Sequence, residues 1–322
     1  MNAGIVGRHA DKVQAAIESD GAARSAVVAS WRRSAALHHL DPAERSLPQR
    51  LSDSELAVAR LRIEPLLRAA ETSLDRLYQA VGGAGCCVLL ADRDGIPVAR
   101  RGATADDETF QEWGLWTGAV WSEESEGTNG IGTCLVEQRT LTIHRDQHFH
   151  TRNTPLSCTA APVYDHEGNL AAALDVSSGR ADLTEGFVNL IAVAVADAAR
   201  RIEAENFRRA FPDARIVVAP AGEKALNALF AVDREDLIVG ATRSARTAFK
   251  LTPERLARPL LAADVLGAET SFATDLREAE RAILERALIR SDGNVTAAAR
   301  ALRMSRATLH RKLSKYGLRH TH

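Results

Sequence analysis

The stretch DGNVTAAARALRMSRATLHRKLSKYGL, from Asp292 to Leu318, decides the fold of the C-terminal part of the chain. Its apolar residues recur every three or four positions in two short runs, the spacing that places side chains on one face of a helix. Asn294 or Thr296 can cap the first helix and Ser305 the second, because their side-chain oxygens accept hydrogen bonds from first-turn amides. The pattern predicts a helix-turn-helix whose second helix begins at about Arg306. The apolar runs are Val295, Ala298, Ala299 and Leu302, then Leu309, Leu313 and Tyr316.

Positive charge is concentrated in the same stretch. From Gly293 onward the chain has seven Lys or Arg residues and no Asp or Glu. The whole chain has 41 basic and 42 acidic residues, so the remainder has 34 against 42, a formal net charge of −8. A helix with unopposed positive charge can enter the major groove of DNA and neutralise phosphates. A solvated helix pair that packs against another domain is the alternative, although such a face normally mixes both signs.

The segment resembles the DNA-binding segment of the Fis family, whose pattern is G-N-x-T-x-A-A-x-x-L-G-I-x-R-x-T-L-x-x-K-L-x-x-Y-G. Arg303 stands where the family usually has glycine, so the turn departs from the pattern. The resemblance implies binding to double-stranded DNA as a homodimer. The matching residues are Gly293, Asn294, Thr296, Ala298, Ala299, Leu302, Arg306, Thr308, Leu309, Lys312, Leu313, Tyr316 and Gly317. The expected DNA contacts are Ser305, Arg306, Thr308, His310, Arg311, Lys312 and Lys315.

Length and composition indicate a soluble protein of several domains. The chain has 322 residues, enough for two or three domains, and 45% of them are hydrophobic, which suffices for packed cores. No apolar run approaches the roughly 20 residues that cross a membrane, and the N-terminus lacks a hydrophobic signal core. We therefore expect a cytoplasmic protein with no membrane contact and no cofactor. Four cysteines form no CxxC pair and are expected in the core: Cys86, Cys87, Cys134 and Cys158.

Helix and strand patterns predict a multidomain α+β protein with four regions. The first has capped helical segments, the second mixes strands and helices, the third is a short α/β connector, and the fourth is all-α. In the first region we expect helices over 11–17 and 25–37, and from Ser52 toward Leu67. The regions are residues 1–68, 69–207, 208–268 and 269–322.

The second region has the pattern of an antiparallel sheet with flanking helices. Turn-forming residues at 92–95 and 165–168 predict two hairpins. The long last helix is expected to bury one face formed by Phe187, Leu190, Ile191 and Ala194. Strands are expected over 86–91, 96–100, 140–143, 159–164 and 169–176, and helices over 130–137 and 184–207.

This region resembles the GAF domains of acetoin-responsive regulators of bacteria. Ser30 to Ser34, S-W-R-R-S, is similar to the S-W-x-R-S leader that precedes the sensor in those proteins. From the residues alone, we interpret the leader as an amphipathic packing or dimerisation helix anchored by Trp31. The resemblance implies a GAF or PAS sensor fold that binds a small-molecule effector. The blocks W-x-E, GTNGIGT, HF, SCxAAP and LDxS are matched by residues 121–123, 127–133, 148–149, 157–162 and 174–177.

The glycine-rich block 127–133 lies at the centre of the expected effector pocket. It lacks the lysine of a P-loop and does not fit G-x-G-x-x-G, so nucleotide binding is disfavoured. We interpret it as a tight turn feeding a helix, with Thr128 and Asn129 directed into a pocket. Tryptophans at 113, 116 and 121 can form an apolar wall, or pack in an ordinary core. The expected ligand-binding residues are Trp116, Trp121, Thr128, Asn129, Ile131, Thr133, His148, Cys158 and Asp175.

Three histidines in one polar loop leave two other kinds of site open. His144, His148 and His150 lie close in sequence, with Cys158 behind them, and both residue types bind zinc or iron. An enzyme is the second alternative, with Cys158 as nucleophile and His144 or His148 as base. We expect neither a metal site nor an enzyme, because His148 belongs to the matched HF block and the loop is polar enough for exposed histidines.

The third region is too short for a complete PAS domain, and we interpret it as a truncated PAS-like connector. Strands are expected over 215–219, 228–231 and 237–240, followed by a helix. The helix that comes next, residues 269–291, corresponds to the helices that build the dimer in Fis-like proteins. Its apolar residues at heptad-like spacing are Leu276, Ala279, Ile283, Leu284 and Leu288.

The resemblance also identifies a domain that is missing between the sensor and the DNA-binding end. Activators with both parts usually hold an AAA+ ATPase between them, but only about 90 residues separate the two parts here, and no G-x-x-x-x-G-K-[ST] motif is present. We therefore expect a one-component regulator that binds operator DNA as a dimer and responds to a small molecule without ATP hydrolysis. RNA polymerase is a further candidate partner. The alternative is a ligand-independent architectural protein or repressor with a degenerate sensor.

Overall fold

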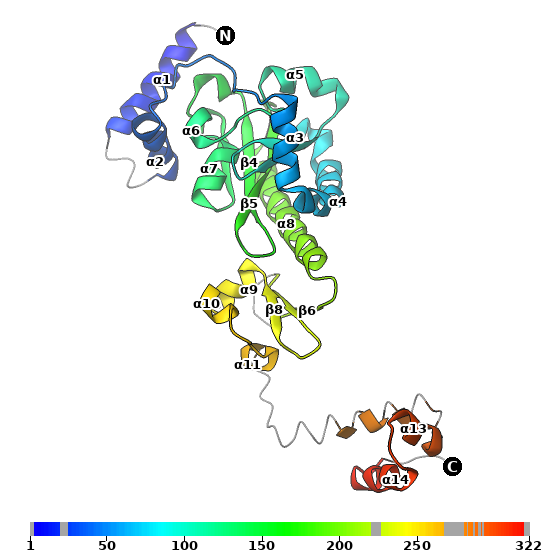
Figure 1. Cartoon of the computed structure of the whole chain (residues 1–322). Coiled ribbons are helices and arrows are strands. Elements are labelled where there is room, and N and C mark those ends of the chain that lie inside the picture. The colour runs from blue at the N-terminus through cyan, green and yellow to red at the C-terminus, as the bar shows by residue number, and fades with distance from the viewer. Residues whose placement is uncertain are drawn as a thin grey trace. The chain divides into compact units, whose positions relative to one another are not determined.

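The computed structural model describes residues 3–19, 25–219, 227–266, 280–281, 283–285, 287–288, 291 and 293–318. The chain divides into two compact units, Met1–Leu260 and Leu261–His322, and each is described by itself (Figure 1). Among the described helices, none combines the length and the apolar character needed to pass through a membrane.

A five-stranded antiparallel sheet with the order β2-β1-β5-β4-β3 is the centre of the first unit. Each strand begins and ends within two residues of its expected range, so the predicted antiparallel sheet is confirmed. The strands are β1 (Cys86–Asp92), β2 (Pro97–Arg101), β3 (Leu141–His144), β4 (Ser157–Tyr164) and β5 (Leu170–Ser178).

One face of the sheet packs against two long helices, α4 (Glu64–Val81) and α8 (Glu185–Ala210) (Figure 1). Successive strand residues point to opposite faces, so alternate residues such as Leu90 and Leu174 meet these helices. The predicted buried face of α8 is partly wrong, because Leu190 is 61% exposed. The buried stripe runs one position later, through Ile191, Val195, Ala198, Ala199 and Ile202.

The opposite face of the sheet is covered by short helices and by the tryptophan-rich segment. Leu89 on this face belongs to the same apolar cluster as Trp121 and Ile131. In Figure 1, α7 lies on the side of β4 and β5 opposite to α8. The helix expected over 130–137 is confirmed. The helices here are α5 (Asp107–Glu112), α6 (Glu123–Glu126) and α7 (Gly130–Glu137).

Both predicted hairpin turns are closed by an aspartate. In the first, Asp92 Oδ1 accepts hydrogen bonds from the amides of Asp94 and Ile96, each at 3.0 Å. Gly95 has a φ of 78°, a left-handed conformation that favours glycine. Asp165 accepts from two amides of the second turn in the same way. In both turns, the aspartate side chain thus accepts the amide hydrogen bonds that the neighbouring strand cannot accept where the chain reverses.

The helix expected from Ser52 toward Leu67 is in fact two helices. Ser52 and Glu55 form a capping box that starts α3 (Asp53–Arg62), as the sequence indicated. The chain leaves helical geometry at Ile63, and α4 has Pro65 in its first turn. Proline is accepted there because first-turn amides have no helical partner, but it disfavours a continuous helix through the residue before it.

Trp31 anchors the leader to the first unit. Its ring is buried in one cluster with Phe149 and Val13, and Nε1 donates to the carbonyl of Gln147 at 2.8 Å. The interpretation of the leader as a packing helix is therefore confirmed, while dimerisation stays a prediction. The leader consists of α1 (Ala3–Glu18), α2 (Ala26–Arg32) and a π-helical turn (Arg33–Leu37).

A buried carboxylate holds the leader to the glycine-rich block. The side chain of Glu123 is 1% exposed and accepts from Arg33 Nε at 2.7 Å and from Arg33 Nη2 at 3.1 Å. Ser30 Oγ donates at 3.0 Å to Glu123 Oε2, the oxygen that also accepts from Arg33 Nη2, and lies 2.7 Å from Thr128 Oγ1. Burying a carboxylate is costly unless it is paired and hydrogen-bonded. Two residues of the S-W-R-R-S motif supply those partners.

The region after α8 contains a three-stranded antiparallel sheet with the order β6-β7-β8. Its strands match the expected ones, which confirms the α/β character of the connector; the likeness to PAS domains stays a prediction. The strands are β6 (Arg215–Val218), β7 (Leu229–Val232) and β8 (Ile238–Ala241), and the helices that follow are α9 (Arg243–Ala248) and α10 (Pro253–Leu256). The next helix, α11 (Ala262–Leu266), belongs to the second unit.

The second unit contains the predicted helix-turn-helix. Asn294 caps α13 (Val295–Ala301) and Ser305 caps α14 (Arg306–Lys315), each by accepting from first-turn amides. Arg303 in the turn has a φ of 52°, which explains why the family usually has glycine at this position. The apolar runs share one core with Leu284 and Leu288. Much of the helix expected over 269–291, including Leu276 and Ala279, lies outside the described residues.

Replacing the buried carboxylate tests how much the leader stabilises the first unit. Glu123→Gln removes the closer of the two carboxylates paired with Arg33 and leaves Glu137 at 3.3 Å, so the free energy of unfolding should fall by about 1–3 kcal/mol. Urea denaturation measures this. Glu124→Gln, on the exposed side of the same helix, is the matched control and should change it by less than about 0.5 kcal/mol. Equal effects of the two substitutions would contradict the role given to Glu123.

Candidate effector site and DNA-binding surface

Two charged residues lie in one row of the sheet, on the face covered by α7. Leu89 of β1 is paired with Arg100 of β2 on one side and with Asp175 of β5 on the other. Paired residues on neighbouring antiparallel strands point to the same face, so Arg100 and Asp175 flank Leu89 with Cα atoms ~10 Å apart. Asp175 is an expected ligand-binding residue, whereas Arg100 was not predicted.

Asp175 is fully buried, and half of its carboxyl group lacks a hydrogen bond. Oδ2 accepts from the hydroxyl of Ser177 at 2.6 Å, whereas Oδ1 has no partner among the described residues. Burial away from water raises the pKa of Asp175 to about 7. Gly130, at the start of α7, permits this packing because a Cβ there would lie 2.8 Å from Oδ1. The carboxyl group can therefore take one more hydrogen bond, as acceptor or, when protonated, as donor.

Arg100 also has unused hydrogen-bonding capacity. Nη1 donates to Asp107 at 2.7 Å, but Nε and Nη2 are buried and have no partner in the described part of the chain. The guanidinium lies over the ring of Trp116, 4.1 Å from its centroid, where a cation–π attraction holds it. Sequence reasoning missed this residue because the pattern of an edge strand does not show which of its faces is covered.

The glycine-rich block uses its polar side chains to hold itself together. Asn129 caps α7 by accepting from the Gly132 amide at 2.8 Å and donates to the Gly127 carbonyl at 2.8 Å. The hydroxyl of Thr133 accepts from the Asn129 amide at 3.2 Å, and Thr128 is bonded to Ser30. Asn129 and Thr128 thus bond to protein partners, and the block is a turn that its own side-chain hydrogen bonds stabilise.

The structure places the expected ligand-binding residues in the core. Eight of the nine are buried and Trp116 is half-buried. Four cavities found among the described residues, with volumes of about 280–430 Å³, are lined by other side chains. The tryptophans divide: Trp121 is packed in the core and donates to the Gly114 carbonyl, whereas Trp113 lines a cavity with Phe110. The predicted ligand role of these residues stays a prediction.

The three loop histidines have separate partners. His144 Nδ1 lies 2.9 Å from the Ser157 hydroxyl, whereas Nδ1 of His148 and of His150 bonds to a backbone carbonyl. Burial lowers the pKa of His148 and of His150 to about 4, so both rings are neutral at neutral pH. Within the described ranges, no three His, Cys, Asp or Glu residues form a group that could hold a metal ion.

Cys158 does not have the surroundings of a nucleophile. Burial and the neighbouring Asp175 raise the pKa of its thiol well above the usual value, and Sγ lies 3.1 Å from the oxygen of the Ser177 hydroxyl, whose proton is donated to Asp175. Reactive cysteines need the opposite, a partly exposed thiolate beside positive charge. The surroundings therefore favour the expectation that Cys158 is a core residue.

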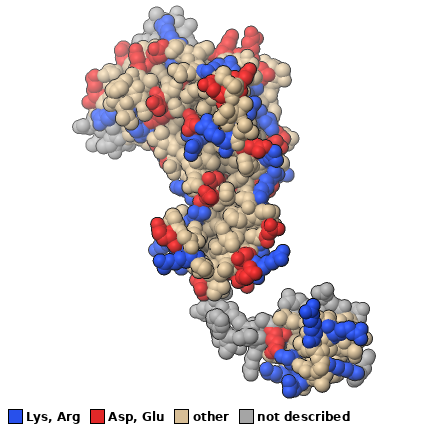
Figure 2. Space-filling model, viewed as in Figure 1, with Lys and Arg blue, Asp and Glu red and all other residues tan. Residues whose placement is uncertain are grey.

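The exposed face of α14 carries unopposed positive charge. Arg306, Arg311 and Lys315 are exposed there and form no ion pair with any described residue. Ser305 accepts from the Thr308 amide at 3.1 Å, so this cap fixes the start of the helix. Figure 2 shows blue Lys and Arg side chains over the visible face of this unit, with red side chains at one edge.

Two of the expected DNA contacts are committed to other roles. Lys312 is ion-paired with Glu280, which also accepts from the Tyr316 hydroxyl. The Thr308 hydroxyl is bonded to that of Ser305 at 2.8 Å. His310 is half-buried. The exposed cations identified above are therefore the residues best placed to contact DNA.

Asp175 should make stability depend on pH. Its pKa is raised from 3.8 to about 7, so the folded state binds this proton more tightly than the unfolded chain and the favourable contribution is lost as pH rises through 7. Asp175→Asn removes that dependence. From about pH 5 to about pH 8, the variant should gain about 2–3 kcal/mol in unfolding free energy relative to the unmodified chain.

Urea denaturation of both proteins at the two pH values measures this difference. The histidines titrate alike in both proteins and cancel in the comparison. A difference between the variant and the unmodified chain that does not change with pH would show that Asp175 is not a buried acid.

The cations of α14 should differ in how they contribute to DNA binding. Arg306→Ala should weaken binding to selected DNA by about 1–3 kcal/mol and relax sequence choice, because an arginine at the start of a recognition helix can reach base edges. Lys315→Ala should weaken binding to all duplexes. It should also reduce the slope of log affinity against log salt concentration by about 1. Fluorescence anisotropy measures both effects. Arg209→Ala, which removes the same charge from α8, is the control, and variants indistinguishable from it would contradict the placement.

Comparisons with known proteins agree with both parts of the structure. The GAF domain family matches residues 65–202, and the family described as bacterial regulatory protein, Fis family, matches residues 275–316. The residues between these matches are too few for an AAA+ domain. Among solved structures, the crystal structure of the E. coli DhaR(N)-DhaL complex has a TM-score of 0.50 at 15% identity, covering 70% of this chain and 76% of that one. That likeness concerns the fold alone.

Two of the curated relatives are regulators named for acetoin. The acetoin catabolism regulatory protein of Cupriavidus necator is 34% identical over 236 residues, which are 72% of this chain and 35% of the relative. The acetoin dehydrogenase operon transcriptional activator AcoR of Bacillus subtilis is 29% identical over 178 residues, 55% of this chain and 29% of the relative. The chain thus spans about a third of their length. It contains a GAF domain and a Fis-family helix-turn-helix segment, and it is similar to transcriptional regulators of acetoin catabolism.

Proposed function

We propose that this chain is a one-component transcription regulator, in which the GAF domain binds a small-molecule effector and paired helix-turn-helix segments bind operator DNA without ATP hydrolysis. The unpaired Oδ1 of Asp175 carries the sensor half of the proposal. A buried polar atom without a partner costs about 1–3 kcal/mol, which a ligand that supplies the missing hydrogen bond would return. The unopposed cations of α14 support the DNA-binding half.

The chemistry of the unpaired groups favours a small neutral molecule with both a hydroxyl and a carbonyl group. Arg100 offers two N–H donors to a carbonyl oxygen, and Asp175 offers an acceptor to a hydroxyl. Acetoin, which appears in the names of both relatives, is a hydroxyketone of this kind. It is therefore the first effector to test. We place its entry beside Trp116, which is half-buried over Arg100.

Two sets of contacts connect the face that carries Asp175 with the rest of the unit, one through α7 and one through α8. Gly130 contacts Asp175 and begins α7, whose preceding loop is bonded to the leader. On the other face, β5 packs against α8, the helix that continues toward the connector. An effector that binds one arrangement of these elements more tightly would shift the population toward it. The output would be the spacing of two recognition helices, because half-sites one turn apart require a separation of ~34 Å.

Selection from a pool of random duplexes with the whole chain tests the proposal. We expect an enriched inverted repeat with half-site centres about one helical turn apart. Acetoin should then change the affinity for that repeat at least ~5-fold, since coupling between sites is commonly 1–3 kcal/mol. Asp175→Asn should keep the DNA affinity and lose the response. Adding the selected DNA should produce no ATP hydrolysis.

The possible outcomes separate this proposal from its alternatives. No enriched sequence would contradict operator binding, whereas ATP hydrolysis that increases with DNA would contradict the one-component mechanism. An enriched repeat that the chain binds equally well with and without acetoin would favour the ligand-independent protein, provided that acetoin also gives no thermal stabilisation. A ligand specific for the folded state must stabilise it.

A further inference from the structure

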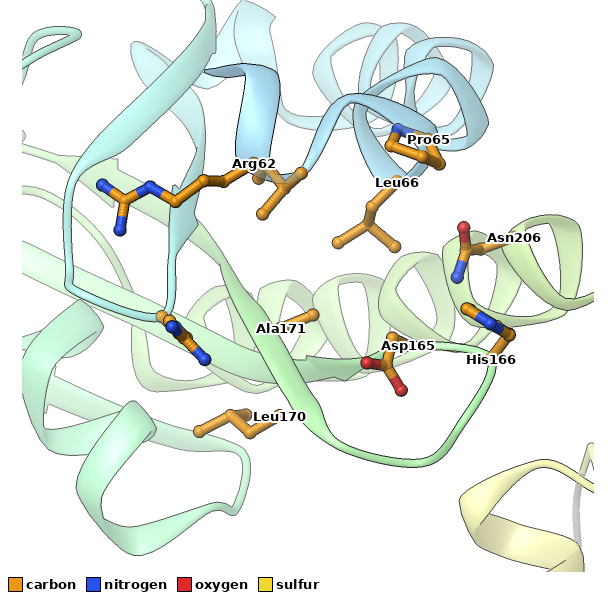
Figure 3. A pocket seen from close by; sticks show the side chains of 10 residues that line it. Arg62, Pro65, Leu66, Asp165, His166, Leu170, Ala171 and Asn206 are labelled. Carbon is orange, nitrogen blue, oxygen red and sulfur yellow. The ribbon is translucent and has the colours of Figure 1, made fainter. Parts of the chain in front are cut away.

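One of the four cavities lies where α3 meets α4, away from the face that carries Asp175. It has a volume of about 330 Å³ and opens beside the two hairpin turns and the last part of α8 (Figure 3). Its apolar side is formed by Ile63, Leu66 and Ala171. No residue of the proposed effector site lines it. Local sequence patterns do not predict this cavity, because its walls come from four separate segments.

Asn206 is the most informative residue of this cavity. It is 4% exposed, yet its carboxamide has no hydrogen bond among the described residues. In Figure 3 the carboxamide extends from α8 into the space bordered by Leu66 and Asp165. The residue is otherwise enclosed, but its amide atoms are not among the fully buried atoms without a partner, so they face the cavity and can bond to what enters it. Asparagine instead of an apolar residue at this position thus indicates a ligand with a polar group.

The cavity also has a cation without a partner. Arg93, in the β1–β2 turn, lines the cavity and forms no ion pair or hydrogen bond in the described part of the chain, whereas Arg62 beside it is paired with Asp94 at 2.8 Å. The one carboxylate that lines the cavity, Asp165, is occupied by the amides of its own turn. Arginine binds carboxylates particularly well, because its N–H groups match the two oxygens.

We infer that this cavity is a second ligand site, for a small carboxylate with a short apolar body and a polar group at its other end. The carboxylate binds Arg93, the apolar body lies on Leu66 and Ala171, and the distal group bonds to Asn206. This arrangement uses one charged anchor, an apolar wall and one polar group for orientation, as small-molecule sites commonly do. Asn206 is followed in α8 by Phe207, which packs on Phe211 beyond the helix end. A ligand here would therefore act on the end of α8.

Titration calorimetry of the whole chain with 6-hydroxyhexanoate tests the inference, because this probe has a carboxylate, an apolar chain and a distal hydroxyl. We expect saturable binding at millimolar concentration. Arg93→Gln should weaken it roughly tenfold, the loss of one charge-assisted interaction. Arg101→Gln changes the same residue type on the adjoining strand, where Arg101 is paired with Asp75, and should leave binding unchanged.

A second probe tests Asn206 separately. Asn206→Leu should weaken 6-hydroxyhexanoate about tenfold but leave hexanoate, which lacks the hydroxyl, nearly unaffected. Arg93 is exposed, so its variant keeps the test valid if the α8 variant fails to fold. No saturable binding of either acid, or equal binding by Arg93→Gln and the unmodified chain, would overturn the inference. Neither result depends on acetoin or on DNA binding.

Discussion

The buried carboxylate of Glu123 is the constraint on which the sensor unit depends. It is surrounded by protein, and within the described ranges its charge is paired with Arg33 while the hydroxyl of Ser30 donates a hydrogen bond, both from a segment 90 residues or more earlier in the chain. Because an unbalanced buried charge is so unfavourable, the leader must dock if the α6–α7 segment is to fold as observed. The same contacts fix Thr128, so leader and glycine-rich block form one structural unit.

A second constraint follows from the two faces of the sheet. The face toward α4 and α8 is apolar, whereas the face toward α7 includes Arg100 and Asp175, whose hydrogen-bonding groups are only partly satisfied. A protein selected for stability alone would favour apolar residues there. Burying a guanidinium and a carboxyl group with unsatisfied hydrogen-bonding atoms lowers stability. Such groups are expected where a ligand supplies the missing hydrogen bonds. This row of side chains is therefore where we propose that the effector binds.

Much of the fold could be predicted because local patterns determine it. Asp92 and Gly95 define a turn by their own chemistry, and Ser305 marks the start of α14 by accepting amide hydrogen bonds. Other features depend on distant partners. Leu190 has the spacing of a buried residue but is exposed, since which stripe of a helix is covered depends on the position of the sheet. The partners of Glu123 and the burial of Arg100 are likewise invisible until the segments meet.

Amide hydrogen exchange of the whole chain with Glu123→Gln tests most directly whether the leader and the glycine-rich block form one unit. The account predicts that exchange increases together in residues 26–37 and 127–133, while α4 keeps its protection, because the two segments share the carboxylate. Faster exchange confined to α6, with the leader protected as before, would contradict it.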